Sequence, residues 1–169
     1  LCTLPEDNSS SRILTIDLEG EGLEGFLTPD IGNLTELNEL NLSKNKFRGP
    51  LSPSIFRLRK ITRLFLSDNF FSGTLSDSFS RLKKLEILDL SQNRLSGPIP
   101  VALSGLRALT LLTLSNNEFS GKIPDLSGMW QLSALDLSRN QLYGNLAMLP
   151  TKLRTLLAHN LLSGHITNI

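Results

Sequence analysis

Two aspartates are the first residues of this sequence that suggest catalysis. Asp89 and Asp136 occupy the same place in two repeated segments, and an inverting glycosidase uses two carboxyl groups ~6.5–9.5 Å apart. We expect them in one column of a sheet, with one strand between them around Thr113. At ~4.8 Å per strand their separation is ~9.6 Å. We expect this column to be open to water, however, and such a surface lacks the burial that turns one carboxyl group into an acid. The preferred interpretation is therefore two solvated surface carboxylates.

The histidines and the cysteine do not add a catalytic or metal-binding pattern. His159 and His165 lie near the carboxyl end, and neither has a cysteine or carboxylate at the spacing of metal ligands. Cys2 is the only cysteine of the chain, and nothing near it would activate its thiol. We therefore predict that the protein is not an enzyme and that it needs no metal and no cofactor.

An apolar group on successive predicted strands indicates binding instead. Phe65, Ile87 and Leu111 are each expected to point away from the core, because side chains alternate between the faces of a strand. They should form one contiguous patch. The charged residues that edge this patch are Arg63, Asp89 and Asp136. A patch of this kind, rimmed by charge, is typical of an interaction site. The alternative is that aromatic and β-branched residues merely suit strands.

A second surface pattern is basic. It comprises Arg57, Arg59, Lys60, Arg81, Lys83, Lys84 and Arg107, which recur at the same places of successive repeats. We interpret this basic ridge as a solvated face that keeps the protein soluble. The alternative is a site for an anionic partner such as pectin or an acidic protein flank. Aromatic residues do not interleave the ridge and the formal net charge is +1, so nucleic acid is not an expected partner.

All of these residues are positioned by one internal repeat. Its clearest copy, at 85–108, reads LEILDLSQNRLSGPIPVALSGLRA, and it superimposes on itself when shifted by 24 residues in either direction. Leu90 then falls on Leu66 and Leu114. A fixed period of this length indicates a solenoid, in which each unit buries its apolar face against its neighbours. The fifth and sixth repeats, at 109–131 and 132–152, are shorter, and we place their deletions on the convex side.

Each position of the repeat has a physical interpretation. Leu85, Leu88 and Leu90 alternate with polar or variable residues, which predicts a short strand with one buried face. An amide side chain at Asn93 can satisfy turning backbone. We therefore predict a buried ladder that comprises Asn45, Asn69, Asn93, Asn117, Asn140 and Asn160. Glu21 replaces the ladder asparagine in the first repeat, and we expect it to turn outward.

The second half of each repeat predicts a bend and a short return path. Gly97 suits a position of positive φ. Pro98 and Pro100 favour extended or turning backbone over a long helix. Phe47, Phe71, Leu95 and Phe119 recur at one position of the period, which predicts core residues.

The pattern LxxLxLxxNxLxGxIP, seen at 85–100, resembles the plant-type extracellular leucine-rich repeat family over nearly the whole chain. The resemblance implies an α/β solenoid, a right-handed superhelix with a parallel sheet on its concave face. We expect 3₁₀ or irregular segments on the convex face. It further implies that 1–12 is the remnant of an amino-terminal cap, with Cys2 at the place of its second cysteine. Residues 13–169 would hold about seven repeats, the last irregular and without a closing cap, so the natural protein is expected to continue further.

Members of this family are plant receptor kinases, receptor-like proteins and polygalacturonase-inhibiting proteins. The resemblance implies the ectodomain of a plant cell-surface receptor, on the apoplastic side of the plasma membrane, that signals through partner receptors. Its partners would be a peptide or protein ligand or a co-receptor ectodomain on the concave or lateral face. A membrane would be reached only through a segment outside this chain. The alternative is a secreted inhibitor of a cell-wall-degrading glycan hydrolase.

Three glycosylation sequons agree with a secreted or cell-surface protein. They begin at Asn8, Asn33 and Asn41. We expect Asn33, on the return path, to be the preferred site, and Asn41, inside a predicted strand, to be a poorer one.

Overall fold

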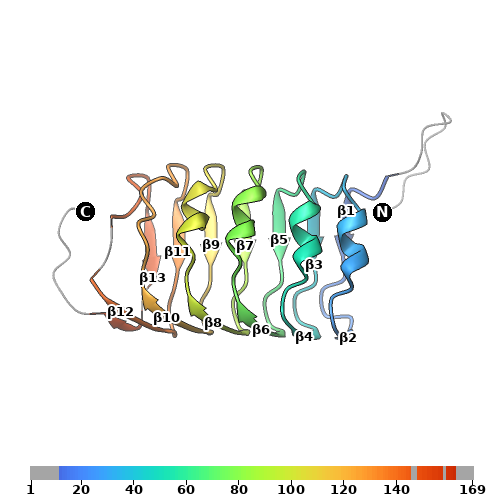
Figure 1. Ribbon diagram of the computed structural model, residues 1–169, viewed down its shortest axis with the longest axis horizontal. Helices are drawn as coiled ribbons and strands as arrows, with labels where there is room; N and C mark the ends of the chain where they lie inside the picture. The colour runs from blue at the N-terminus through green and yellow to red at the C-terminus, as the bar shows by residue number, and fades with distance from the viewer. Residues whose placement is uncertain (1–11, 146–147, 158, 163–169) are drawn as a thin grey trace.

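The chain winds into successive coils of similar size, for which the computed structural model describes residues 12–145, 148–157 and 159–162 (Figure 1). Each coil runs from a short strand through a turn to a second strand and then returns. The cap predicted at 1–12 lies almost wholly outside the described residues. The coils form a right-handed solenoid, the hand that parallel crossover connections take.

The first strands of the coils form one parallel sheet of seven strands, and it lines the concave side. Its strands are β1 (Thr15–Asp17), β3 (Glu39–Asn41), β5 (Arg63–Phe65), β7 (Ile87–Asp89), β9 (Leu111–Thr113), β11 (Ala134–Asp136) and β13 (Thr155–Leu157). The register follows the repeat, since Leu64 lies opposite Leu88 and Leu88 opposite Leu112. These three central leucines are fully buried, so the residues on either side of each point outward.

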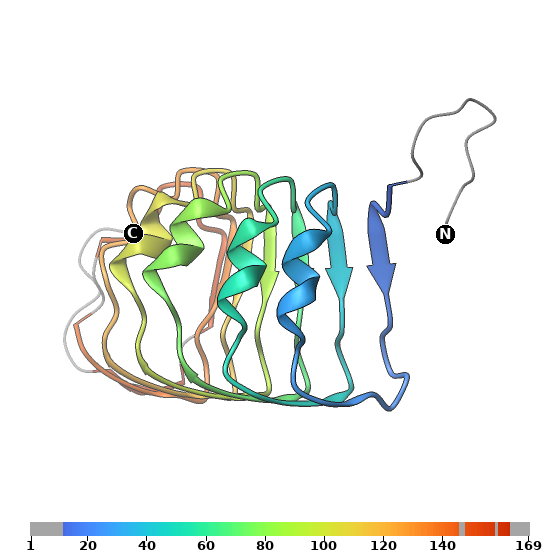
Figure 2. The same ribbon diagram turned by 45° about the vertical axis from the view of Figure 1, so that its right-hand side comes forward.

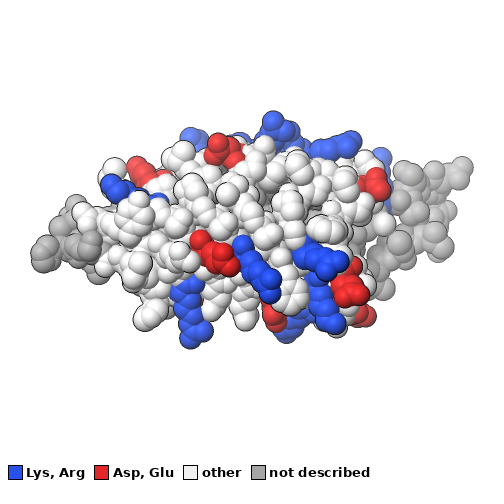
Figure 3. All heavy atoms as spheres, turned by 60° about the horizontal axis from the view of Figure 1, so that its bottom comes forward, with Lys and Arg blue, Asp and Glu red and all other residues white. Residues whose placement is uncertain are grey.

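The second strands form another parallel sheet of seven strands, which the sequence analysis did not predict. They are β2 (Glu24–Gly25), β4 (Lys46–Gly49), β6 (Phe70–Thr74), β8 (Arg94–Pro98), β10 (Glu118–Lys122), β12 (Gln141–Gly144) and β14 (Leu161–Leu162). Figure 3 views the molecule from the side on which this sheet lies. From β2 to β10 its register is offset by 22 residues rather than 24, because Ser72 lies opposite Arg94 and Ser96 opposite Glu118. In the shortened coils that follow, the offset falls further. Gly97 has a φ of 76°, as predicted for the bend.

Short 3₁₀ helices form the return path of the first four coils, on the side opposite the first sheet (Figure 2). They are η1 (Pro29–Asn33), η2 (Pro53–Arg57), η3 (Asp77–Arg81) and η4 (Val101–Gly105). The predicted short convex segments are therefore confirmed. Hydroxyl groups cap two of them: Thr28 Oγ1 accepts a hydrogen bond from Asp30 N, and Ser76 Oγ accepts one from Ser78 N.

The shortened fifth coil returns without such a helix. A carboxylate replaces the helix cap there, because Asp125 Oδ1 accepts a hydrogen bond from Ser127 N at 2.8 Å. A hydrogen bond from the Ser127 side chain, followed by this backbone bond, holds the pKa of Asp125 below its ordinary value. Leu126 and Met129 still reach the core and are fully buried.

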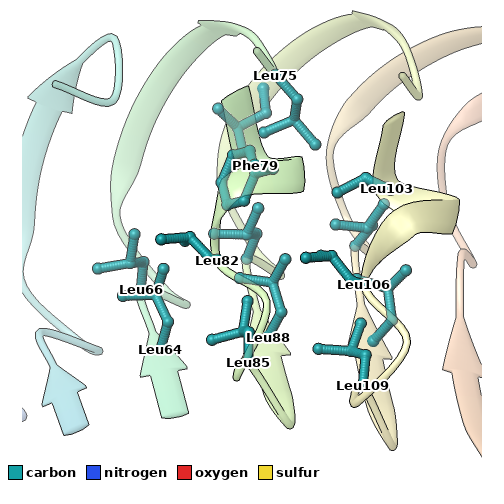
Figure 4. Close-up of a cluster of buried hydrophobic side chains, with 14 of the residues drawn as sticks. Leu64, Leu66, Leu75, Phe79, Leu82, Leu85, Leu88, Leu103, Leu106 and Leu109 are labelled. Carbon is teal, nitrogen blue, oxygen red and sulfur yellow. The ribbon is translucent and has the colours of Figure 1, made fainter. Parts of the chain in front are cut away.

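The core runs along the solenoid between the two sheets and the return segments, and each coil packs its leucines against those of its neighbours (Figure 4). Phe71 and Phe119 are fully buried, whereas Phe47 is half-buried, so their predicted place in the core is confirmed. The ring of Phe79 packs edge-on against Phe56, with ring centres 5.0 Å apart. Burying each leucine stabilises the fold by about 1.5–3 kcal/mol.

The asparagine ladder is confirmed and joins each coil to the one before it. Asn93 Nδ2 donates to the carbonyl oxygens of Leu66 at 2.9 Å, Leu90 at 3.2 Å and Ser91 at 3.0 Å. Its Oδ1 accepts from the backbone amide of Phe71 at 2.9 Å. Both directions of the amide are therefore used, and two of the four bonds cross to the preceding coil.

The other ladder residues repeat this arrangement with small differences. Asn45, Asn69 and Asn117 are buried like Asn93, while Asn140 and Asn160 are only half-buried. Glu21, which replaces the asparagine in the first coil, is exposed as predicted.

We predict that Asn93→Ala destabilises the protein, because it removes four hydrogen bonds and leaves the buried backbone amide of Phe71 unpaired, at about 1–3 kcal/mol for that group. Chemical unfolding followed by circular dichroism measures the change in the free energy of unfolding. Asn38→Ala is the matched control, since Asn38 is exposed. Equal stability of the two variants would contradict the role of the ladder.

Candidate ligand-binding surface

Two columns of side chains point outward from the first sheet. The first column comprises Thr15, Glu39, Arg63, Ile87, Leu111 and Ala134. The second column comprises Asp17, Asn41, Phe65, Asp89, Thr113 and Asp136. Successive members of a column lie directly opposite each other on neighbouring strands. We call this surface the sheet face.

The predicted apolar residues meet near the middle of the sheet face, but not in one row. Ile87 and Leu111 lie directly opposite each other in the first column. Phe65 belongs to the second column, where its direct neighbours are Asn41 and Asp89. It is therefore diagonal to Ile87, at the ~7–8 Å that an aromatic side chain can bridge. All three side chains are half-buried, so the apolar centre is narrow and partly covered.

The cation at the edge of this centre, Arg63, is already paired. Arg63 lies between Glu39 and Ile87 in the first column. Its Nη1 is 3.3 Å from Glu39 Oε2. Both side chains stay partly exposed, so the pair is of the surface kind that contributes about 0–1 kcal/mol. A carboxylate of a partner can therefore compete with Glu39 for this guanidinium at small cost.

Asp89 and Asp136 have a structural role that was not predicted from the sequence. Asp89 Oδ1 accepts hydrogen bonds from the backbone amide of Ser91 at 2.9 Å and from its hydroxyl at 2.6 Å. Asp136 Oδ1 accepts one from Ser138 N at 2.9 Å. Each aspartate thus closes the turn that follows its strand. The repeated Asp-x-Ser sequence was the signal for this role.

The same position carries an amide in the second coil. Asn41 Oδ1 accepts from Ser43 N at 3.1 Å, and its Nδ2 donates to Glu19 Oε2 at 3.1 Å. Lys44 Nζ lies 2.7 Å from Glu19 Oε1. The hydrogen bond from Lys44, followed by that from Asn41, holds the pKa of Glu19 below its ordinary value. The amide of Asn41 is therefore engaged on both sides.

The remaining candidate residues give no second chemical site. Asn33 is exposed at the end of η1, and its Nδ2 donates to Asp30 Oδ1 at 3.4 Å. Asn8, Cys2 and His165 lie outside the described residues, and His159 is exposed. Within the described part of the chain, no three His, Cys, Asp or Glu side chains are placed to hold a metal ion. Nor does any helix there have the length and apolar character to cross a membrane.

The comparisons with known proteins agree on the family. The family model described as "Leucine rich repeat" matches residues 59–119, and another of the same description matches residues 36–58. A comparison with curated protein sequences finds no significant relative.

Three solved structures illustrate the likeness. A Pollen Receptor Kinase 3 is 35% identical with a TM-score of 0.82, over 94% of this chain and 79% of that one. The ectodomain of the receptor kinase SOBIR1 from Arabidopsis thaliana is 31% identical with a TM-score of 0.70, and the alignment covers 93% of this chain and 82% of that one. The Arabidopsis receptor kinase HAESA, in complex with the peptide hormone IDA and the co-receptor SERK1, is 34% identical with a TM-score of 0.83.

The extent of these matches differs. The alignment with HAESA covers 90% of this chain but only 26% of that one, so the chain spans about a quarter of its length. The alignments with Pollen Receptor Kinase 3 and SOBIR1 cover most of both chains. The chain therefore belongs to the leucine-rich repeat family, in the form found in the ectodomains of plant receptor kinases.

Proposed function

We propose that this chain is a ligand-binding part of a plant cell-surface receptor and that a peptide or protein binds its sheet face. The fold supports a binding role, because the similar HAESA structure holds a peptide hormone and a co-receptor. The observation that carries the proposal is the partly exposed apolar centre formed by Ile87 and Leu111, with Phe65 diagonal to it.

The dimensions of the sheet face suit an extended peptide or the flank of a protein. Seven strands at ~4.8 Å spacing span ~30 Å, which matches an extended segment of about nine residues at ~3.3 Å each. A partner that covers the apolar centre removes apolar surface from water, which stabilises the complex by about 25 cal/mol for each Å² buried.

Charge at the edge of the apolar centre would set the orientation of the partner. Arg63 presents a guanidinium on the side of the amino-terminal coils, and its pair with Glu39 is exposed. A carboxylate of the partner can form two parallel hydrogen bonds with that guanidinium. Asp89 and Asp136 use one oxygen each for the following turn, and they supply negative charge on the other side.

We further propose that the chain acts on the apoplastic side of the plasma membrane, in a receptor that signals together with partner receptors. The similar chains are receptor-kinase ectodomains, and the exposed sequon at Asn33 agrees with passage through the secretory route.

The first test replaces the apolar centre. Phe65→Ser with Leu111→Ser removes the anchors, and loss of a central anchor costs ~2 kcal/mol or more, which is about a thirtyfold weaker Kd. The protein would be screened against synthetic secreted plant peptides and a SERK-type co-receptor ectodomain, and each hit measured by calorimetry against parent and variant. Val101→Ser with Met148→Ser is the control, because both residues are exposed outside the sheet face. Unchanged affinity in a folded Phe65/Leu111 variant would show that the sheet face is not the binding site.

The second test concerns the glycan. When the protein is secreted from plant cells, we expect Asn33 to carry a glycan and Asn41 to remain bare, because the Asn41 amide is held by Glu19 and Ser43. Mass spectrometry of the glycopeptides measures the occupancy of both. Thr35→Ala serves as a control that destroys the Asn33 sequon and leaves Asn33 itself in place. A bare Asn33, or a fully occupied Asn41, would contradict the prediction.

A further inference from the structure

The outer face of the second sheet carries a row of alternating phenylalanine and arginine residues from successive coils. We call it the arginine–phenylalanine strip, and it consists of Phe26, Arg48, Phe70 and Arg94. Three of its members lie in β4, β6 and β8, and Phe26 directly follows β2. Figure 3 shows basic side chains on this face, with acidic ones among them.

Contacts within the strip fix its side chains. The guanidinium carbon of Arg48 lies 5.5 Å from the ring centre of Phe26, and that of Arg94 lies 4.9 Å from the ring centre of Phe70. Arg48 and Phe70 are also direct neighbours in the sheet register. These cation–π contacts keep each guanidinium group beside an aromatic ring.

The ring of Phe26 packs against Gly49. A Cβ atom at Gly49 would come within 2.6 Å of a ring carbon of Phe26, and the φ of Gly49 is 80°. The ring therefore lies directly on the backbone of β4 and is still 68% exposed. Phe70 is 43% exposed. Two partly exposed aromatic rings thus alternate with two guanidinium groups along the strip.

An open hollow of about 380 Å³ lies along the strip. Its lining comprises Glu24, Lys46, Arg48, Gly49, Phe70, Ser72 and Arg94. Three of these residues are cationic and one is anionic. The one carboxylate of the lining is Glu24 on β2, directly opposite Lys46 in the sheet register. The centre of the hollow therefore favours an anion.

The cations that line the hollow form no ion pair with any residue that the structure describes. Among the ion pairs of the described residues, none includes Lys46, Arg48 or Arg94. The basic ridge shares this property, because Lys60, held by Glu36 at 2.6 Å, is its one cation in an ion pair of the described residues. What distinguishes the strip is the hollow and the two exposed rings beside its cations. The anionic partner that the sequence suggested for the ridge thus finds a better-formed surface on the second sheet.

We propose that the strip binds an acidic polysaccharide, a chain of uronic acid units. Its carboxylates would bind Arg48, Arg94 and Lys46, and the apolar faces of its sugar rings would pack on Phe26 and Phe70. Arg48 and Arg94 lie two strands apart and are displaced by two residues along the strands, so their backbones are ~12 Å apart. A polymer with a carboxylate on every unit can reach both cations. A strip on a flat sheet offers no deep pocket for a peptide anchor. This site lies on a different sheet from the sheet face and does not rest on the function proposed there.

The experiment measures binding of oligogalacturonate to the whole chain by calorimetry at low and physiological salt. We expect saturable binding that weakens with salt, and at least about a tenfold weaker Kd for Arg48→Gln with Arg94→Gln. We expect Phe26→Ser with Phe70→Ser to weaken binding as well. The matched control is Arg81→Gln with Lys84→Gln, which removes the same charge from the basic ridge. Thermal unfolding establishes that each variant is folded, and Lys46→Gln, at an exposed position, tests the same cluster without disturbing a cation–π contact.

Two further ligands separate a glycan site from simple charge attraction. The methyl ester of the same oligomer keeps the sugar chain and loses the charge, and poly-glutamate keeps the charge and loses the sugar. We expect both to bind at least about tenfold more weakly than oligogalacturonate. The proposal is overturned if oligogalacturonate does not bind, if either substitute binds equally well, or if the ridge variant weakens binding as much as the strip variant.

Discussion

The stacked amide bonds of the ladder asparagines are the interaction on which the rest of the structure depends. Each coil leaves turn carbonyl groups inside the solenoid, and one amide nitrogen satisfies them within its own coil and in the preceding one. The oxygen of the same amide accepts from a backbone amide 22 residues earlier, as Asn93 does from Phe71. Between the full-length coils the second sheet has this same offset of 22 residues, whereas the first sheet keeps the 24-residue period. The ladder therefore stands where the chain changes from one register to the other.

That change of register requires strained backbone beside the ladder. Residues of positive φ precede the ladder asparagines, and they are Lys44, Asp68, Gln92, Asn116 and Arg139, with φ of 53–56°. A left-handed conformation costs a residue with a Cβ atom about 1–2 kcal/mol. The cost recurs in every one of these coils and is offset by the amide bonds and by the leucines buried on either side of the turn. A single coil could not offset it, because half of each ladder connection belongs to the neighbour. Stability is accordingly a property of the stack.

The repeat made most of the fold predictable from the sequence, whereas the arrangement of side chains on the surfaces was less predictable. The first sheet, the ladder, the bend at Gly97 and the short convex segments follow from residues that recur at a visible period. The second sheet was missed because its register differs from that period, so residues two places apart in the repeat become neighbours. The position of Phe65 was predicted to the correct face of the sheet. The turn bonds of Asp89 and Asp136 were missed because the carboxylates were considered as surface charge alone.

The two sheets explain how one scaffold can serve unrelated ligands. Residues that point inward are fixed by the core and the ladder. Residues that point outward, such as Ile87 on the first sheet and Arg94 on the second, contribute little to the core or to the ladder. Substitutions there change the chemistry of a surface without altering the coil, so similarity of fold to other ectodomains leaves the ligand undetermined.

The different registers of the two sheets also determine which residues become neighbours on each surface. On the first sheet equivalent residues of successive repeats form a column, which brings Ile87 beside Leu111. On the second sheet the shift of two places alternates residue types instead, which brings Arg48 beside Phe70. The concave surface can thus collect like residues into an apolar centre, and the lateral surface mixes cations with aromatic rings.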